Sequence, residues 1–262
     1  MVAEDRTRRD PRSLVTRDRR RPRSEPSRPR SDDEGPSATA DEPAVRRIQR
    51  GYAAWARAYD WFARATASVG GVRAGCVRAL DLEPGDTVVE FGCGPGVNAP
   101  ALREAVGPTG RVVGVDVTGA MLDRARALAE RRGWENVELV RGDATDPPVR
   151  SADAVLATFV TSLFADPYAV VSDWCDLADS VVVASFAPRG SRPANAALSA
   201  FARLNGRLFD AAGGDPLGQL DARTAAAGRA IADNAATATE ERFLFGTVTM
   251  CAGHGRAGHR PE

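Results

Sequence analysis

The stretch VVEFGCGPG, residues 88–96, runs from a short apolar segment into three glycines that alternate with other residues. The apolar segment predicts a buried strand, and the glycines predict a tight turn in which the backbone approaches a ligand closely. Glu90 stands near the carboxyl end of that strand, where open α/β sheets bind their ligands. The stretch therefore predicts a ligand site at the edge of a parallel sheet.

Further apolar runs follow, separated by segments of helical length and composition. Such alternation predicts parallel strands joined by right-handed helical crossovers, and nearly all-apolar strands fit a sheet covered on both faces. A final strand pair, hinged at Gly246, completes the predicted sheet. The expected strands cover residues 87–91, 111–115, 137–141, 153–157, 180–185, 241–245 and 247–252.

Helical segments flank and interrupt this sheet. Residues 44–82 carry apolar side chains at spacings of three and four, which predicts one or two N-terminal helices. After the fifth strand, residues 190–236 are expected to form a helical cap. Its two helices are placed at residues 194–209 and 221–235.

The two ends of the chain differ in composition from the middle. Residues 1–43 consist mainly of Arg, Asp, Glu, Pro and Ser, and such a segment buries too little apolar surface to fold, so we expect disorder there. Residues 253–262 are also expected to be frayed. One domain of catalytic size, residues 44–252, remains between these tails.

Composition excludes several classes of function. The 262 residues carry 35 basic and 35 acidic side chains, so net charge indicates no attraction to nucleic acid. Every basic residue is Arg, which excludes lysine-based covalent catalysis. The four cysteines are scattered and the two histidines, His254 and His259, stand in a glycine-rich stretch, so no metal site is expected. We expect a reduced, cytoplasmic protein without a transmembrane segment.

Twenty residues after Gly96, the next apolar run ends at Asp116. A carboxylate at that position is placed to accept both hydroxyl hydrogens of a ribose, so the ligand is predicted to be a nucleoside. Nicotinamide-dependent dehydrogenases also combine a glycine turn with an acidic residue, but their third glycine would fall at Val97. An acidic site with Glu90 suits a cation better than a diphosphate. The pattern therefore favours S-adenosylmethionine over a dinucleotide.

Together, E-x-G-x-G-x-G at residues 90–96, Asp116, and the sequence Gly142-Asp143-Ala144 after the third strand resemble class I S-adenosylmethionine-dependent methyltransferases. The resemblance covers about residues 52–252. It implies a Rossmann-like, doubly wound α/β fold with a seven-stranded sheet, mostly parallel, a C-terminal antiparallel strand and a helical lid after the fifth strand.

The resemblance also implies roles for individual residues. Asp143 would bond the adenine amino group, and residues 158–161 would line the methyl donor and face the acceptor. The stretches YAAWARAYDWFARA (52–65) and FLFGTVTMCAG (243–253) resemble the quinone-biosynthesis and phospholipid N-methyltransferase branch, whose tyrosine over the cofactor matches Tyr59. The expected cofactor-binding residues are Tyr59, Glu90, Gly92, Cys93, Gly94, Gly96, Asp116, Val117, Met121, Asp143, Ala144, Thr158 and Phe159.

The expected function is in-line methyl transfer to a small, lipophilic acceptor such as a quinone precursor or a phospholipid. No catalytic residue is assigned, because an activated methyl donor needs positioning more than acid–base groups. Two alternatives stay open, a nicotinamide-dependent oxidoreductase and a non-catalytic cofactor-binding module. Transient membrane contact is allowed for, and the sequence leaves the oligomeric state open.

Overall fold

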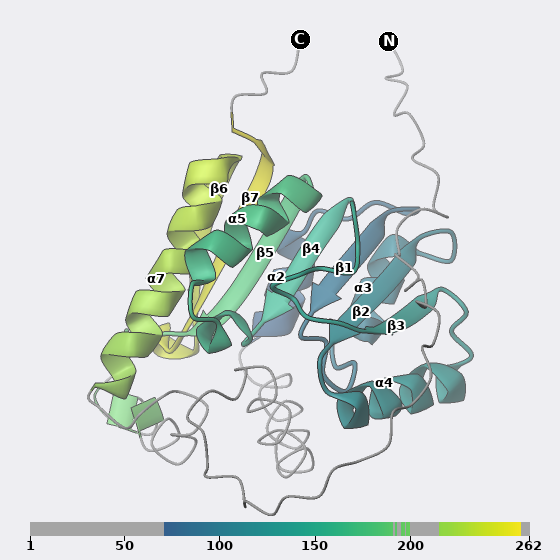
Figure 1. The fold of residues 1–262 in the computed structure, drawn as a ribbon, viewed down its shortest axis with the longest axis horizontal. Coiled ribbons are helices and arrows are strands. Elements are labelled where there is room, and N and C mark those ends of the chain that lie inside the picture. The colour runs from purple at the N-terminus through teal and green to yellow at the C-terminus, as the bar shows by residue number, and fades with distance from the viewer. Residues whose placement is uncertain (1–70, 191, 193–194, 197, 200–214, 258–262) are drawn as a thin grey trace, which may run out of the picture.

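The computed structural model describes residues 71–190, 192, 195–196, 198–199 and 215–257. Seven strands form one sheet in the order β3-β2-β1-β4-β5-β7-β6 (Figure 1). Neighbours among β1 to β5 are parallel, and β7 runs antiparallel to both β5 and β6. The strands are β1 (Thr87–Phe91), β2 (Arg111–Asp116), β3 (Val137–Arg141), β4 (Ala154–Thr158), β5 (Ser180–Phe186), β6 (Ala235–Phe243) and β7 (Val248–Arg256).

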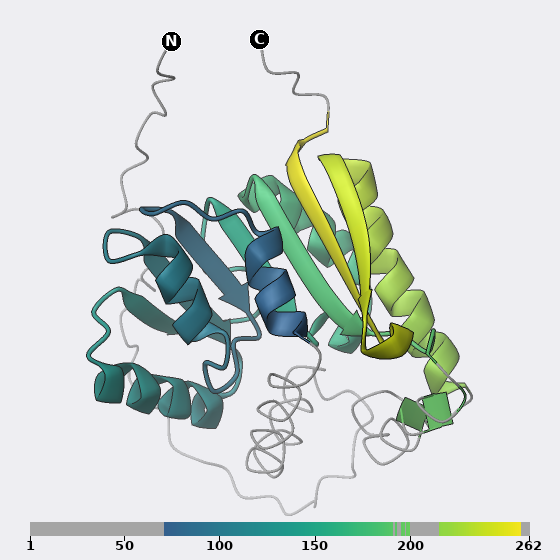
Figure 2. The same ribbon diagram turned by 180° about the vertical axis from the view of Figure 1, so that it is seen from behind.

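Helices cover both faces of the sheet, as Figures 1 and 2 show from opposite sides. α5 (Pro167–Leu177) and α7 (Pro216–Asn234) lie on one face, and α2 (Val72–Ala79) and α3 (Ala99–Val106) lie on the other. α4 (Gly119–Arg132) packs against β2 and β3. This arrangement confirms the predicted sheet with helices on both sides.

The strand β1 contributes side chains alternately to the two apolar cores. Val89 and Phe91 belong to the core under α5 and α7, whereas Val88 belongs to the core under α2 and α3. Trp174 of α5 is fully buried and stacks on Phe91 with ring centroids 4.8 Å apart. Burying each such large side chain contributes about 1.5–3 kcal/mol, so β1 is held from both faces.

The connection between β3 and β4 carries no helix, contrary to the predicted alternation. Residues 142–153 run as a loop with an isolated bridge between Asp143 and Asp146. Pro147 and Pro148 remove two backbone donors and restrict the residues before them, which disfavours a helix there. Ala144 and Val149 of this loop are buried in the core under α5 and α7, so the loop supplies apolar side chains where a helix was predicted.

The boundaries of the C-terminal elements differ from the predicted ones. α7 begins at Pro216 instead of residue 221, because the Asp215 side chain accepts a hydrogen bond from the Leu217 N–H and caps the helix. β6 begins at Ala235, six residues before the predicted start, and is exposed along nearly its whole length. An exposed edge strand lacks the alternation of apolar and polar residues from which a strand is predicted.

The last strand extends further than expected. β7 continues to Arg256, four residues into the segment predicted to be frayed, because His254 pairs with Ser180 of β5 and Thr237 of β6. The predicted hinge is confirmed at η4 (Leu244–Gly246), where Gly246 has a φ of 88°. The N-terminal tail, Tyr59 and most of the predicted helix at 194–209 lie outside the described residues.

No helix in the described part of the chain is long and apolar enough to cross a membrane. The same residues contain no group of three or more His, Cys, Asp or Glu side chains that are placed to hold a metal ion. The four cysteines are buried and free.

Candidate functional site

A cavity of about 290 Å³ lies at the carboxyl ends of the strands, beside the point where the strand order reverses between β1 and β4. Ligands of open α/β sheets bind at this position. The lining residues come from the end of β2, from α4 and from the segments that follow β1, β2, β3 and β4. They are Gly92, Gly94, Val115, Asp116, Val117, Thr118, Met121, Gly142, Asp143, Ala144, Thr145, Phe159, Val160, Leu163, Phe164 and Ala165.

The glycine turn after β1 is fastened to β2 by its backbone. The N–H groups of Gly92 and Cys93 both donate to the Val115 carbonyl, at 2.8 and 3.1 Å. Gly94 has a φ of 55°, and a Cβ added there would meet no protein atom within 4 Å. Gly94 therefore faces open space in the cavity, with a backbone conformation that glycine adopts without strain.

Asp116, at the end of β2, is held by two backbone donors. Its Oδ2 accepts the N–H of Gly94 at 2.9 Å, and its Oδ1 accepts the N–H of Thr118 at 2.8 Å. Burial raises the pKa of Asp116, whereas the bonds from Thr118 and Gly94 lower it. Each carboxylate oxygen has a second lone pair, so the fixed carboxylate can accept two more donors from a ligand in the cavity.

The loop after β3 forms another wall of the cavity. Asp143 accepts the N–H and the hydroxyl of Thr145 through one oxygen, Oδ1, at 2.9 and 2.8 Å. The buried Trp174 donates its indole N–H to the Ala144 carbonyl at 2.9 Å, which fixes the backbone there. Met121 of α4 is buried and lines the cavity as well. An acidic group, a fixed backbone and an apolar side chain thus meet in one place.

The segment after β4 divides between the cavity and the interior. Phe159 and Val160 line the cavity, but Thr158 and Thr161 do not. The Thr161 hydroxyl lies 2.5 Å from the Ser185 hydroxyl of β5, under α7. Residues 158–161 therefore do not form one continuous wall. Phe159 lines the cavity with a φ of 63°, which is unusual for a bulky residue.

Glu90 is buried beneath the glycine turn and is not among the residues that line the cavity. The Asn98 side chain donates from Nδ2 to Glu90 Oε1 at 2.6 Å and to the Thr158 hydroxyl at 3.2 Å. Burial raises the pKa of Glu90 to about 7, although the bond from Asn98 and the charge of Arg73 both lower it. This carboxyl therefore titrates near neutral pH.

The structure brings most of the predicted cofactor-binding residues to one cavity. Cys93, Gly96, Glu90 and Thr158 do not line it. Cys93 packs toward β2, since a Cβ on Gly114 would lie 2.9 Å from its Sγ, and Gly96 packs against Ala125 of α4. The predicted residues that line the cavity are Gly92, Gly94, Asp116, Val117, Met121, Asp143, Ala144 and Phe159.

Sequence reasoning missed several residues of this site. Asn98 and Arg73 meet only in the folded chain, because Arg73 Nη1 donates to Asn98 Oδ1 across 25 positions and to the Thr158 hydroxyl across 85. In the sequence alone, Asn98 is typical of a residue that begins a helix, and Arg73 is typical of an exposed helical residue. Leu163, Phe164 and Ala165 also line the cavity, and their apolar run after β4 was the available signal.

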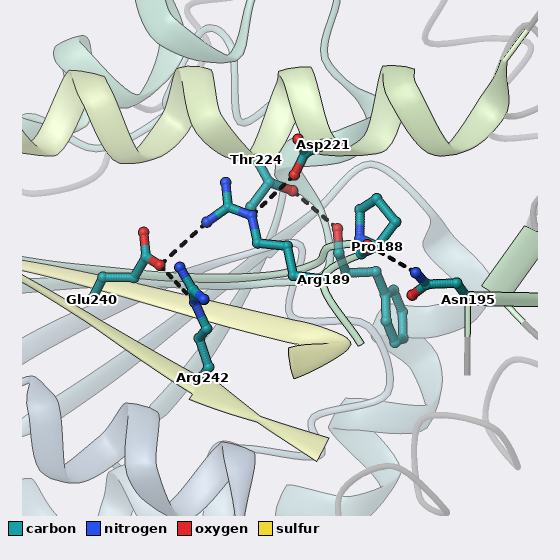
Figure 3. Close-up of polar contacts among 8 residues, drawn as sticks. Pro188, Arg189, Asn195, Asp221, Thr224, Glu240 and Arg242 are labelled. Carbon is teal, nitrogen blue, oxygen red and sulfur yellow. Dashed lines mark hydrogen bonds and ion pairs between the residues drawn. The ribbon is translucent and has the colours of Figure 1, made fainter. Parts of the chain in front are cut away.

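Hydrogen bonds and ion pairs join the end of β5 and the residues just after it to α7 and β6 (Figure 3). Arg189, just after β5, pairs with Asp221 of α7 at 3.1 Å and with Glu240 of β6 at 3.2 Å. The Thr224 hydroxyl of α7 donates to the Phe186 carbonyl at 3.0 Å. The Phe186 ring stacks on Phe159 with centroids 4.6 Å apart, so these contacts reach the cavity wall.

Residues 88–178 match a family model described as a methyltransferase domain. The match begins within β1 and ends after α5, so it contains the glycine turn, Asp116, Asp143 and the segment after β4. This part of the chain is similar to methyltransferase domains. The matched range includes every residue that lines the cavity.

Curated relatives are similar over part of their length. A nocamycin O-methyltransferase from Saccharothrix syringae is 38% identical over 105 residues, which are 38% of this chain and 38% of that protein. An aklanonic acid methyltransferase from Streptomyces sp. (strain C5) is 34% identical over 107 residues, 39% of this chain and 49% of that protein. A protein-L-isoaspartate O-methyltransferase from Methanothermobacter thermautotrophicus is 39% identical over 66 residues, which are 25% of this chain and 30% of that protein. The chain thus spans less than half of each.

Solved structures share the fold. A chain of the complex between the Haloferax volcanii Trm112 methyltransferase activator and the putative methyltransferase matches with a TM-score of 0.52 and 19% identity, over 82% of this chain and 100% of that chain. A possible exported protein from Bordetella parapertussis matches with a TM-score of 0.54 and 19% identity, over 71% and 67%. These likenesses confirm the predicted Rossmann-like α/β architecture.

Proposed function

We propose that the protein is an S-adenosylmethionine-dependent methyltransferase whose cavity holds the adenosine part of the cofactor. The observation that carries this proposal is the pair of carboxylates in one cavity, Asp116 and Asp143, with Gly94 open between strand ends. Asp116 would accept the ribose hydroxyls, and Asp143 with the Ala144 backbone would hold the adenine. Val117 and Met121 would pack against the ring.

The residues present fit a nucleoside with a cationic end. Gly94 lacks the side chain that would fill the cavity, and the two carboxylate oxygens of Asp116 can each accept one of two vicinal hydroxyls. The cavity is about the size of the smaller ligand pockets, roughly 300 Å³. When bound, the cofactor supplies a methyl group that is already activated, so the protein's task is to hold donor and acceptor in line at about 3–3.5 Å.

No general base is assigned by this proposal. In the described part of the chain, the titratable side chains that line the cavity are Asp116 and Asp143, and both are given to the nucleoside. The acceptor would therefore bring its own nucleophilic atom, or lose its proton to water.

Titration with S-adenosylhomocysteine and with NAD separates this proposal from the oxidoreductase alternative. We expect saturable binding of S-adenosylhomocysteine and none of NAD at the same concentrations. Tight NAD binding in its place would refute the cofactor assignment. A protein that binds S-adenosylhomocysteine but methylates nothing in an extract of its source would instead be a non-catalytic module.

We further propose a small, lipophilic acceptor. Phe159, Val160, Leu163 and Phe164 give the cavity an apolar wall, and two of the relatives are named for nocamycin and aklanonic acid. Quinone precursors and phospholipids follow from the resemblance of residues 52–65 and 243–253, and a cytoplasmic location is part of the same proposal. Transfer of labelled methyl to an isoaspartyl peptide, but to no quinone precursor, phospholipid or aromatic polyketide, would refute this acceptor class.

A further inference from the structure

Asn98 stands at the position that normally caps a helix, yet its side chain does not cap α3. An Asn at this position commonly accepts a backbone N–H of the first turn and stabilises the helix by about 1 kcal/mol. Here the side chain is buried and turned inward, toward Glu90 and Thr158. An Asn side chain that does not cap its own helix is a candidate for a functional role.

Hydrogen bonds fix the orientation of the Asn98 amide. Its Oδ1 accepts from Arg73 Nη1 at 2.9 Å, and its Nδ2 donates to Glu90 Oε1 at 2.6 Å. A flipped amide would place its NH2 group against the Arg73 guanidinium and its oxygen against the carboxylate. Arg73 and Glu90 together therefore fix the orientation of the Asn98 amide.

The charges around Glu90 come from two elements. Arg73 of α2 is the cation that acts on Glu90, and Asp116 at the end of β2 is the anion. The thiols of Cys76 on α2 and Cys93 in the glycine turn also face Glu90, but burial raises the pKa of both and keeps them protonated. Removing Arg73 would leave the Glu90 carboxylate buried beside Asp116 without its cation.

We propose that Arg73 is a positioning residue for cofactor binding. It acts through Asn98 to hold the buried Glu90 carboxylate, whose negative charge attracts the ammonium group at the amino-acid end of the cofactor without lining the cavity. The inference rests on the proposed methyltransferase function and adds a residue outside the glycine motif. Arg73 Cζ also lies 5.6 Å from the centre of the Phe159 ring, so the same side chain supports the cavity wall.

Two ligands test this role. S-adenosylhomocysteine carries the amino-acid end, and 5′-methylthioadenosine has the same nucleoside without it. We expect Arg73→Met to weaken binding of S-adenosylhomocysteine by about tenfold or more and to leave 5′-methylthioadenosine within about twofold. Arg78→Met, an exposed arginine on the same helix, is the matched control and should change neither affinity. Equal weakening of both ligands would mean a general structural role and would overturn the proposal.

The pH dependence supplies a second readout. For the unaltered protein, affinity for S-adenosylhomocysteine should fall as pH drops below about 7, where Glu90 takes up a proton. In Arg73→Met the same fall should begin at a higher pH, since the guanidinium lowers the Glu90 pKa. Arg73→Lys keeps the charge, so its pH profile should be shifted less than that of Arg73→Met. A loss of affinity that is equal at every pH would mean direct contact with the ligand and would refute the indirect role.

Thermal unfolding of each variant shows whether the protein is folded at the temperature of the titration. If Arg73→Met is unfolded, Arg73→Gln, which removes the charge but keeps a hydrogen-bond donor, takes its place, and an unmoved pH profile in that variant would overturn the proposal. Failure of the unaltered protein to bind either nucleoside would refute the proposed function itself. Binding of both by the unaltered protein, with no selective effect of Arg73→Met, would refute this inference alone.

Discussion

Replacing Glu90 by Gln should stabilise the protein at neutral and alkaline pH while weakening its cofactor site. Gln has nearly the shape of Glu, and its carbonyl oxygen can still accept the bond from Asn98 Nδ2. What the substitution removes is the charge that the folded chain buries beneath the glycine turn. Stability and binding should therefore move in opposite directions.

The magnitude follows from the pKa of Glu90, which burial raises from 4.5 to about 7. At 1.36 kcal/mol per unit, that rise corresponds to about 3 kcal/mol at most. Between these two pKa values the folded state binds more protons than the unfolded state, so the free energy of unfolding falls as pH rises through this window. The Gln variant has no such proton, and its advantage should be nearly full at pH 8 and reduced to about 1 kcal/mol or less at pH 5.

Urea unfolding at pH 5 and pH 8 measures both values. We expect Glu90→Gln to exceed the unaltered protein by up to about 3 kcal/mol at pH 8, with no comparable gain at pH 5. Glu104→Gln, an exposed glutamate on α3, is the control and should show no such difference. A Glu90→Gln variant equal to the unaltered protein at pH 8, or more stable by the same amount at both pH values, would refute the reasoning.

Three further substitutions test other parts of the site. Asp116→Asn should weaken S-adenosylhomocysteine binding by at least about tenfold and lower the unfolding free energy by about 1–3 kcal/mol, because its NH2 group must face the N–H of Gly94 or Thr118. Calorimetric titration and urea unfolding measure the two effects, and unchanged affinity would contradict the ribose role. Cys93→Ala should leave that affinity within about twofold, because Cys93 packs toward β2; a large loss in the same titration would place its side chain in the cofactor site. Arg189→Met should lower the unfolding free energy by about 1 kcal/mol or less, since its ion pairs are partly exposed, and a double-mutant cycle with Asp221→Asn would contradict the pairing if the two effects simply added.

The strands near the cavity were predictable because their sequences are bounded sharply. β1 and β3 begin and end at the predicted residues, since each is a short apolar-rich run between turn residues. The glycine turn, Asp116 and Asp143 follow these runs directly, and strand ends of parallel sheets meet at one edge. Local sequence and fold therefore agree at the strand ends that frame the cavity.

The elements far from the cavity were harder to place, for a physical reason. β6 lies at the edge of the sheet with most residues exposed, so its backbone pairing with β7 is not accompanied by an apolar pattern. The start of α7 depends on the Asp215 cap and Pro216, signals that are weaker than an apolar stripe. In both cases, hydrogen bonds rather than burial set the boundary.

Side chains that act over long sequence separations account for the remainder of the site. Glu90 was predicted at the strand end, but its burial and its bond to Asn98 depend on how α3 leaves the glycine turn. Arg73 reaches the same group from a helix that precedes β1. A sequence motif specifies the groups that meet a ligand, whereas the pKa of one of those groups is set by residues outside the motif. The protonation of Glu90, and with it the pH range in which the proposed site would bind a cation, is therefore a property of the folded chain.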